Sequence, residues 1–166
     1  MYKKVEIFFG TRYMVFLNKE NSMDTKEAKE MIYQKERTLE LLYNDIYKGY
    51  HYYILSLGTH PTAYIEIPKK NILYKKDYDE IYDMGIDPPV NGGLTYSDGI
   101  LWINENTLMR DPWYIGWDYG HCCDYYGGFN DKINKNKKKW TTKEIIEECQ
   151  NAIDYLIIEL EKRNDR

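Results

Sequence analysis

Acidic and imidazole side chains recur at a three-residue spacing in segment 111–129, where Asp118, His121 and Asp124 follow one another. A carboxylate beside an imidazole orients the ring and raises its pKa, which makes histidine a proton carrier near neutral pH. Two carboxylates and one imidazole are also a ligand set that a divalent metal accepts. The spacing matches no established metal motif, so we expect these side chains to contact a bound molecule.

Two other roles stay open for this trio. The aspartates can cap turns while His121 bonds a backbone carbonyl in a polar corner of the core, or the three can perform acid–base or metal-assisted catalysis. We predict no cofactor, and a divalent metal is the less favoured alternative. A Cys–His nucleophile formed by His121 with Cys122 or Cys123 is only weakly indicated. Residues adjacent in the sequence rarely face each other, and nothing else marks either thiol as activated.

A strand is predicted directly before the trio, since residues 113–117 are aromatic and β-branched. Side chains at the exit of a rigid sheet occupy the usual position of binding and catalytic groups. Trp113, Trp117 and Tyr96 are therefore predicted to stack on the ligand or wall its pocket.

Further ligand contacts are predicted outside this segment. Asn91, Gly92 and Gly93 precede a short strand, and paired glycines let a backbone pass close to a ligand or to a neighbouring chain segment. His60, in the turn between two predicted strands, completes the predicted ligand-binding set, although a turn histidine is more often exposed and inert.

The length of 166 residues predicts one domain over residues 1–166. The contents of 43% hydrophobic and 30% charged residues exclude a disordered chain. The net charge of −4 gives no global positive field. We therefore expect no general nucleic-acid binding, and any anion site must be local. Five lysines within residues 130–139 predict an exposed loop, with a phosphate clamp as the less favoured interpretation.

A cytoplasmic location without a membrane partner is predicted from both the N-terminal segment and the cysteines. The first apolar run is interrupted by Glu6 and ended by Gly10, too short for a signal peptide or a spanning helix. Three cysteines, an odd number without a C-x-x-C spacing, fit a reducing compartment. A homo-oligomer is compatible with the sequence.

Hydrophobic patterning predicts an α+β fold, with an antiparallel sheet of about five to seven strands and two long amphipathic helices packed on it. One helix is predicted within residues 24–49, with Asp24 as its N-cap, and the other begins at Thr141 with a capping box to Glu144. One or two helical turns are predicted around residues 77–82. Strands are predicted at residues 4–9, 12–17, 50–57, 62–67, 94–96, 100–103 and 113–117, with a loop at 104–112. Residues 1–49 comprise the N-terminal hairpin and the first helix, and residues 50–166 form the rest of the domain, its core.

Four segments occur in an order that resembles a family of small uncharacterised proteins of bacteria and their phages. The first segment is Ile67 and Pro68, and the second combines Leu73 and Tyr74 with residues 77–79. The third is residues 92–96, and the fourth is residues 113–124. The family pattern has a strand ending in V-P, then G-H-P-L-Y-x-x-D-Y-D, H-G-G-L-T-Y, W-x-x-G-F-D-x-x-H-x-x-D and an acidic helix. The similarity covers about residues 50–160.

Three departures from the family pattern bear on the chemistry. Asn71 and Asn91 stand where the family has histidines, and Trp117 replaces a phenylalanine. Asparagine keeps hydrogen-bonding capacity but carries no proton near neutral pH and is a poor transition-metal ligand. The replacements therefore weigh against catalysis more than against a binding pocket.

The residues and the resemblance together predict a small phage or prophage accessory protein that binds a small polar, nucleotide-like molecule without turnover. Phage carriage suggests sequestration of a host signalling molecule as a counter-defence. One alternative is a hydrolase of nucleotide-like substrates that uses His121 with Asp118 or Asp124. Another is a protein–protein inhibitor or adaptor with exposed tyrosines as anchors.

Overall fold

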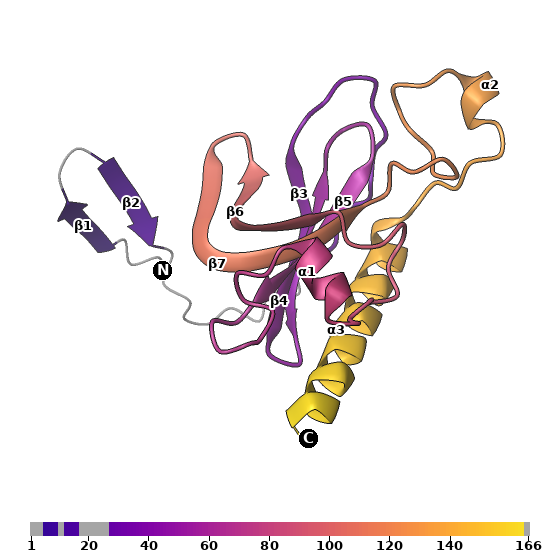
Figure 1. Cartoon of the computed structure of the whole chain (residues 1–166). Coiled ribbons are helices and arrows are strands. Elements are labelled where there is room, and N and C mark those ends of the chain that lie inside the picture. The colour runs from indigo at the N-terminus through magenta and orange to yellow at the C-terminus, as the bar shows by residue number, and fades with distance from the viewer. Residues whose placement is uncertain (1–4, 10–11, 17–26, 165–166) are drawn as a thin grey trace.

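The structure, a computed structural model, describes the backbone of residues 5–9, 12–16 and 27–164 and the side chains of residues 27–163. A five-stranded antiparallel sheet has the strand order β3-β4-β5-β7-β6, and β1 pairs with β2 in a separate hairpin (Figure 1). The elements are β1 Val5–Phe9, β2 Arg12–Phe16, β3 Glu40–Tyr47, β4 Tyr50–Ser56, β5 Pro61–Ile67, α1 Tyr78–Asp83, β6 Tyr96–Asn104, β7 Thr107–Asp118, α2 Asp131–Asn134 and α3 Thr142–Asn164.

The α+β class and the antiparallel sheet are confirmed, but only one of the two predicted long helices occurs in the described residues. Residues 27–39 are not helical, and residues 40–47 form the edge strand β3, so the predicted helix within 24–49 is wrong. Asp24 lies outside the described residues. Leu41 and Leu42 face different cores, as neighbours in a strand do, and a bulge at Leu42 lets Leu42 and Tyr43 pack on the same core. Pairing with β4 overrides the helical spacing of the apolar residues.

Locally encoded elements agree with the sequence. The N-terminal hairpin, β4, β5 and α3 occur where they were predicted, and α1 begins after Asp77 with a capping box to Glu80.

The strands predicted at 94–96 and 100–103 are instead one strand, β6. The loop predicted at 104–112 is wrong, because β7 already begins at Thr107 after a two-residue turn. The lysine-rich loop contains one short helix, α2.

Two hydrophobic cores lie on the two faces of the sheet, because side chains alternate along each strand. The long helix α3 covers one face and buries Ile145, Cys149, Ile153 and Leu156 against it. The β6–β7 hairpin bends at two bulges, one with extra residues in β7 and one with an extra residue in β6, and places Leu101 against Tyr53, Leu55 and Tyr114 on the other face (Figure 1). The ends of β5 and β7 are therefore held firmly between two packed layers.

No helix in the described ranges combines the length and apolar character needed to cross a bilayer.

Packing of α3 on the sheet predicts a difference between two isoleucines of the same helix. Ile153 is fully buried, whereas Ile158 is 51% exposed. Ile153→Ala should lower the free energy of unfolding by about 2–5 kcal/mol, because it leaves a cavity in the core. Ile158→Ala should change it by less than about 0.5 kcal/mol. Urea denaturation followed by circular dichroism measures both, and equal losses would contradict the assigned helix face.

Candidate functional site

The predicted trio lies at the end of the sheet where β7 stops and β5 begins. Asp118 pairs with Thr62 across these strands, and His121 and Asp124 follow in the turn after β7. His60 immediately precedes β5, and Asn91 reaches this end of the sheet from another loop. We call this end of the sheet, with Asp118, His121, Asp124, His60 and Asn91, the corner. The structure thus brings together side chains from distant parts of the chain.

Asp124 is the most enclosed member of the trio, with 3% of its surface exposed. Its Oδ2 accepts hydrogen bonds from Nδ2 of Asn91 at 2.8 Å and from the backbone N–H of His121 at 3.0 Å. Its Oδ1 accepts a bond from Nε1 of Trp140 at 2.8 Å. Because both oxygens already have donors, Asp124 serves as an internal anchor for three chain segments.

Asp118 is more accessible, with a side chain that is 30% exposed. Its Oδ1 accepts a bond from the backbone N–H of Gly120 at 2.9 Å, and its Oδ2 accepts one from Oγ1 of Thr95 at 3.2 Å. Nε2 of His121 lies 3.9 Å from Oδ1, beyond hydrogen-bond distance. Asp118 therefore stabilises the turn after β7 and bonds the adjoining Thr95.

His121 packs its ring directly against Gly92. A Cβ at position 92 would lie 1.9 Å from Nε2 of His121, and this nitrogen is buried without a hydrogen-bond partner. Both Gly92 and Gly93 have positive φ, and a Cβ on Gly93 would lie 2.6 Å from the Tyr82 hydroxyl. The paired glycines thus admit neighbouring side chains, one of the two roles expected for them.

His60 is buried, so the expectation of an exposed turn histidine is wrong. Its Nδ1 lies 2.9 Å from Oγ1 of Thr59, and its ring stacks on Tyr126 with centroids 5.0 Å apart. Burial lowers the pKa of His60; the carboxylate of Asp118 opposes this effect, and Arg37 lowers the pKa further. The ring is therefore held neutral in a packed position.

The predicted aromatic walls lie elsewhere. Trp117 is buried beneath α3, where its Nε1 donates to Glu148 Oε2 at 3.0 Å. Trp113 lies at the far end of the β5–β7 pairing and donates to Oγ of Ser97 at 2.9 Å. Tyr96 packs edge-on against Tyr64, with ring centroids 5.2 Å apart. The alternation of side chains puts Trp117 on the opposite face from Asp118, which excludes it from the corner.

A shallow cleft of about 850 Å³, widely open to solvent, lies beside this corner. Its lining comprises Tyr82, Asp87, Pro88, Pro89, Val90, Asn91, Gly92, Gly93 and Glu148. Asn91, Gly92 and Gly93 were predicted from the sequence, but Asp118, His121 and Asp124 do not line the cleft. Its volume falls within the range of about 300–1,000 Å³ that small-molecule sites occupy.

Residues 87–93 form the cleft wall and are tied to the rest of the molecule. The backbone N–H of Asp87 donates to the Tyr155 hydroxyl of α3 at 3.1 Å, and the Tyr82 hydroxyl accepts a bond from the N–H of Leu94. Pro88 and Pro89 restrict the backbone between these points. The corner supports the wall through the bond from Asn91 to Asp124.

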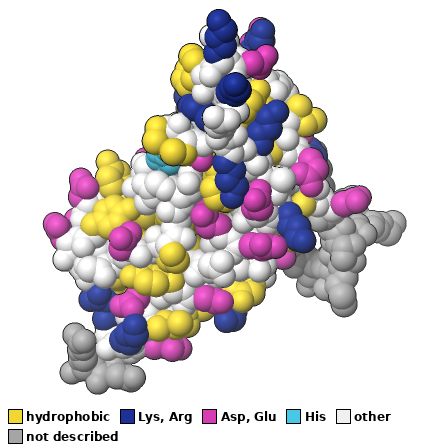
Figure 2. All heavy atoms as spheres, turned by 90° about the vertical axis from the view of Figure 1, so that its right-hand side faces the viewer, with side chains coloured by type: hydrophobic (Ala, Val, Ile, Leu, Met, Phe, Trp, Pro, Cys, Tyr) yellow, Lys and Arg dark blue, Asp and Glu magenta, His cyan; other side chains and the backbone are white. Residues whose placement is uncertain are grey.

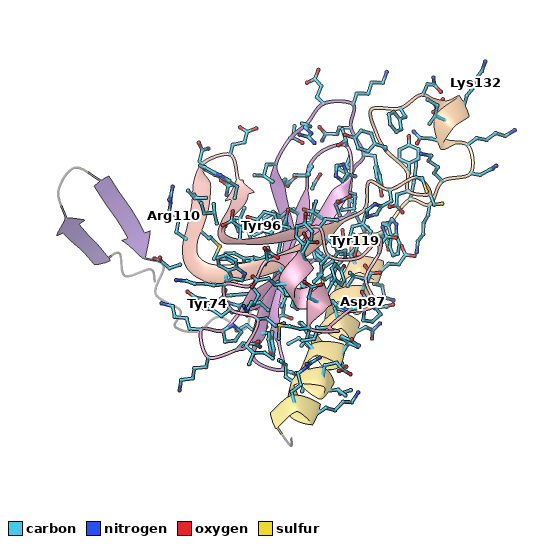
Figure 3. All side chains as sticks on the ribbon, in the orientation of Figure 1. Tyr74, Asp87, Tyr96, Arg110, Tyr119 and Lys132 are labelled. Carbon is cyan, nitrogen blue, oxygen red and sulfur yellow. The ribbon has the colours of Figure 1, made fainter. Side chains whose placement is uncertain are left out.

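The sequence did not identify Tyr82, Asp87, Pro88, Pro89, Val90 or Glu148 as cleft residues, and Glu148 of α3 is the most distant of these from the predicted segment along the chain. Its Oε2 accepts bonds from Trp117 Nε1 and from the Tyr119 hydroxyl. Burial raises the pKa of Tyr119 well above its usual range, so the phenol stays protonated and acts as the donor. Tyr119 and Asp87 both lie beside α3 (Figure 3). Glu148 lies three residues after the buried Ile145, so an acidic residue stands on an otherwise apolar face of the helix. This break in the apolar pattern is the sequence feature that points to Glu148.

In the part of the chain that the structure describes, neither a metal centre nor a thiol pair extends this site. Within the described residues, no group of three or more His, Cys, Asp or Glu side chains is arranged to hold a metal ion. Cys122 and Cys123 are exposed, with sulfur atoms 3.5 Å apart, while Cys149 is buried under α3.

Comparison of the chain with models of known protein families, with curated proteins and with solved structures finds no match. The family resemblance stays a prediction, and the geometry of the cleft carries the functional proposal.

The anchoring role of Asp124 predicts a large effect on stability. Asp124→Ala leaves the donors of Asn91, His121 and Trp140 without their acceptor, and we expect a loss of about 2–4 kcal/mol in the free energy of unfolding. Asp118→Ala, at a more exposed carboxylate, should cost less than about 1.5 kcal/mol. Urea denaturation measures both, and a smaller loss for Asp124→Ala than for Asp118→Ala would refute the anchor.

Burial of His60 predicts a pH dependence of stability. Its pKa is lower in the folded protein than the usual value of about 6.5 in an unfolded chain, so the unfolded state binds more protons between the two values. The stabilisation is complete above this window and is lost as pH falls through it. His60→Gln should therefore weaken the decrease in unfolding free energy between about pH 7.5 and about pH 5.5. Denaturation curves with the same pH dependence for both proteins would contradict this.

Proposed function

We propose that this protein binds a small polar molecule, rich in hydrogen-bond donors, in the cleft between residues 87–93 and α3, without turnover. The observation that carries the proposal is the lining of the cleft. Two carboxylates, one phenol and the backbone of a double-glycine segment line a shallow, open cleft that is large enough for one small ligand.

The charges of the lining define the class of ligand. Asp87 and Glu148 offer acceptors, and the described lining residues include no lysine or arginine. A phosphate group would be repelled by these carboxylates, whereas an amine or a base with N–H groups would bond to them. Within the nucleotide-like class predicted from the sequence, the lining favours an unphosphorylated nucleoside or nucleobase.

Binding without turnover is supported by the positions of the groups that a hydrolase would use. Both oxygens of Asp124 are occupied by internal donors, and Nε2 of His121 is buried against Gly92. A general base must come within hydrogen-bond reach of the proton that it abstracts. We therefore assign the trio to support of the cleft wall.

Sequestration is the biological role that we propose for such a site. A protein that holds a small molecule without converting it lowers the free concentration of that molecule by mass action. This role suits the phage or prophage accessory protein expected from the sequence, and we propose that it operates in the cytoplasm.

A ligand panel and one pair of variants test the proposal. Nucleosides, nucleobases and polyamines should bind in native mass spectrometry and calorimetry, and the matching nucleotides should bind more weakly. Asp87→Asn should weaken the best ligand about tenfold, because it removes a charged acceptor. Asp83→Asn, at an exposed carboxylate of α1 outside the cleft, is the matched control and should leave affinity unchanged.

Four results would refute this function. They are preference for the phosphorylated members, binding by no member of the panel, product formation from a bound member, and equal loss of affinity in Asp83→Asn and Asp87→Asn.

A further inference from the structure

Residues 125–139 form a projecting segment that we call the lysine arm, with α2 near its tip (Figure 1). It carries Lys132, Lys135, Lys137, Lys138 and Lys139 and one acidic residue, Asp131. In Figure 2, Lys and Arg side chains gather at the upper end of the molecule, where the arm projects, with hydrophobic side chains between them. This local positive charge contrasts with the net charge of −4 of the whole chain.

The arm has a built interior. Asn134 is buried and donates hydrogen bonds from Nδ2 to the carbonyl of Tyr126 at 2.9 Å and to that of Phe129 at 3.2 Å. Its Oδ1 accepts the N–H of Tyr126 at 3.2 Å. Gly127 lies so close to Gln34 that a Cβ would be 2.0 Å from the Gln34 carbonyl oxygen. These contacts fix the shape of the arm and distinguish it from a run of solvated lysines.

A stack of three rings runs from the sheet into the arm. His60 stacks on Tyr126 with centroids 5.0 Å apart, and Tyr126 packs on Phe129 with centroids 4.8 Å apart. The stack begins at a buried ring and ends at Phe129, which is 45% exposed, while the nearby Ile133 is 51% exposed. An aromatic side chain held open to solvent on a fixed support is a surface on which another flat ring can stack.

One cation lies over the open end of this stack, and a second lies over the neighbouring ring of Tyr125. Nζ of Lys137 lies 5.3 Å from the centroid of Phe129, and Nζ of Lys139 lies 4.2 Å from that of Tyr125. Lys138 is engaged elsewhere, because its Nζ lies 3.1 Å from Glu144 Oε1. Lys132 and Lys135 are exposed on and beside α2. The arm thus combines a stacking surface with several ammonium groups.

We propose that the lysine arm binds single-stranded nucleic acid, with a base stacked on Phe129 and the flanking phosphates against the lysines. A single strand presents both an open base face and a phosphate backbone, and proteins bind it through exposed aromatic rings in a positively charged setting. A duplex hides its base faces in the stack, so it could use only the charge. The surface lies apart from the acidic cleft and does not depend on the function proposed for that cleft.

Fluorescence anisotropy with a labelled oligothymidylate of about 15 nucleotides tests this inference at low salt. We expect binding that weakens steeply as salt is added, because lysines release counterions from the phosphates. Phe129→Ala should weaken it about tenfold or more, and Phe129→Tyr should retain it, because stacking needs a ring. Asp87→Asn should leave it unchanged, which separates this test from that of the cleft.

A charge-matched pair isolates the contribution of the arm. Lys132→Glu with Lys135→Glu should abolish detectable binding, whereas Lys69→Glu with Lys70→Glu, at exposed lysines outside the arm, should have a much smaller effect. Circular dichroism confirms that each variant is folded. The inference is overturned if the single strand does not bind, or if a duplex or anionic phosphatidylglycerol vesicles bind equally well. It is also overturned if Phe129→Ala binds the single strand like the unaltered protein, or if both lysine pairs reduce the affinity for the single strand equally.

Discussion

The buried carboxylate of Asp124 is the interaction on which this end of the molecule depends. Removing a carboxylate from water costs free energy that only close donors offset. Here the donors come from Asn91 in the cleft wall, from His121 after β7 and from Trp140 next to the start of α3. One acidic group therefore sets the relative positions of the wall, the turn and the long helix.

Two surfaces of opposite charge are built outward from this corner. Asn91 connects it to the cleft, which two carboxylates make acidic, and His60 connects it to the lysine arm through the ring of Tyr126. The polar residues that first attract notice in the sequence are thus mostly internal supports. The residues proposed to meet partners, Glu148 and Phe129 among them, occupy less conspicuous positions.

Sequence patterns predicted the elements that short stretches encode. Alternation and turn residues located β4 and β5, and a capping box located the start of α3, while α1 was predicted only as one or two helical turns around residues 77–82. The prediction of a helix within residues 24–49 is wrong because β3 is determined by its pairing with β4, and no local sequence pattern encodes that contact. The long β6–β7 hairpin was missed because its two-residue turn, Glu105 and Asn106, contains no glycine.

The same distinction between local and distant contacts applies to the site. The three-residue spacing places the trio in one turn at the end of the sheet, but its partners Asn91 and Trp140 come from far along the chain. Gly92 was recognised as a point of close approach, whereas the group that approaches it, the ring of His121, depends on the tertiary fold. Spacing thus identifies residues that share a region, and it leaves the direction of each side chain to packing.

The two bulges between β6 and β7 have a further effect at the margin of the sheet. An uninterrupted outer strand offers a regular ladder of free N–H and C=O groups to which a second chain can add. The bulge at residues 102–104 puts backbone groups of β6 itself out of register, and the bulge in β7 increases the local twist, so an incoming strand could pair with β6 only over a few residues. The irregularity that lets the hairpin close over the second core thereby also protects the protein against edge-to-edge aggregation.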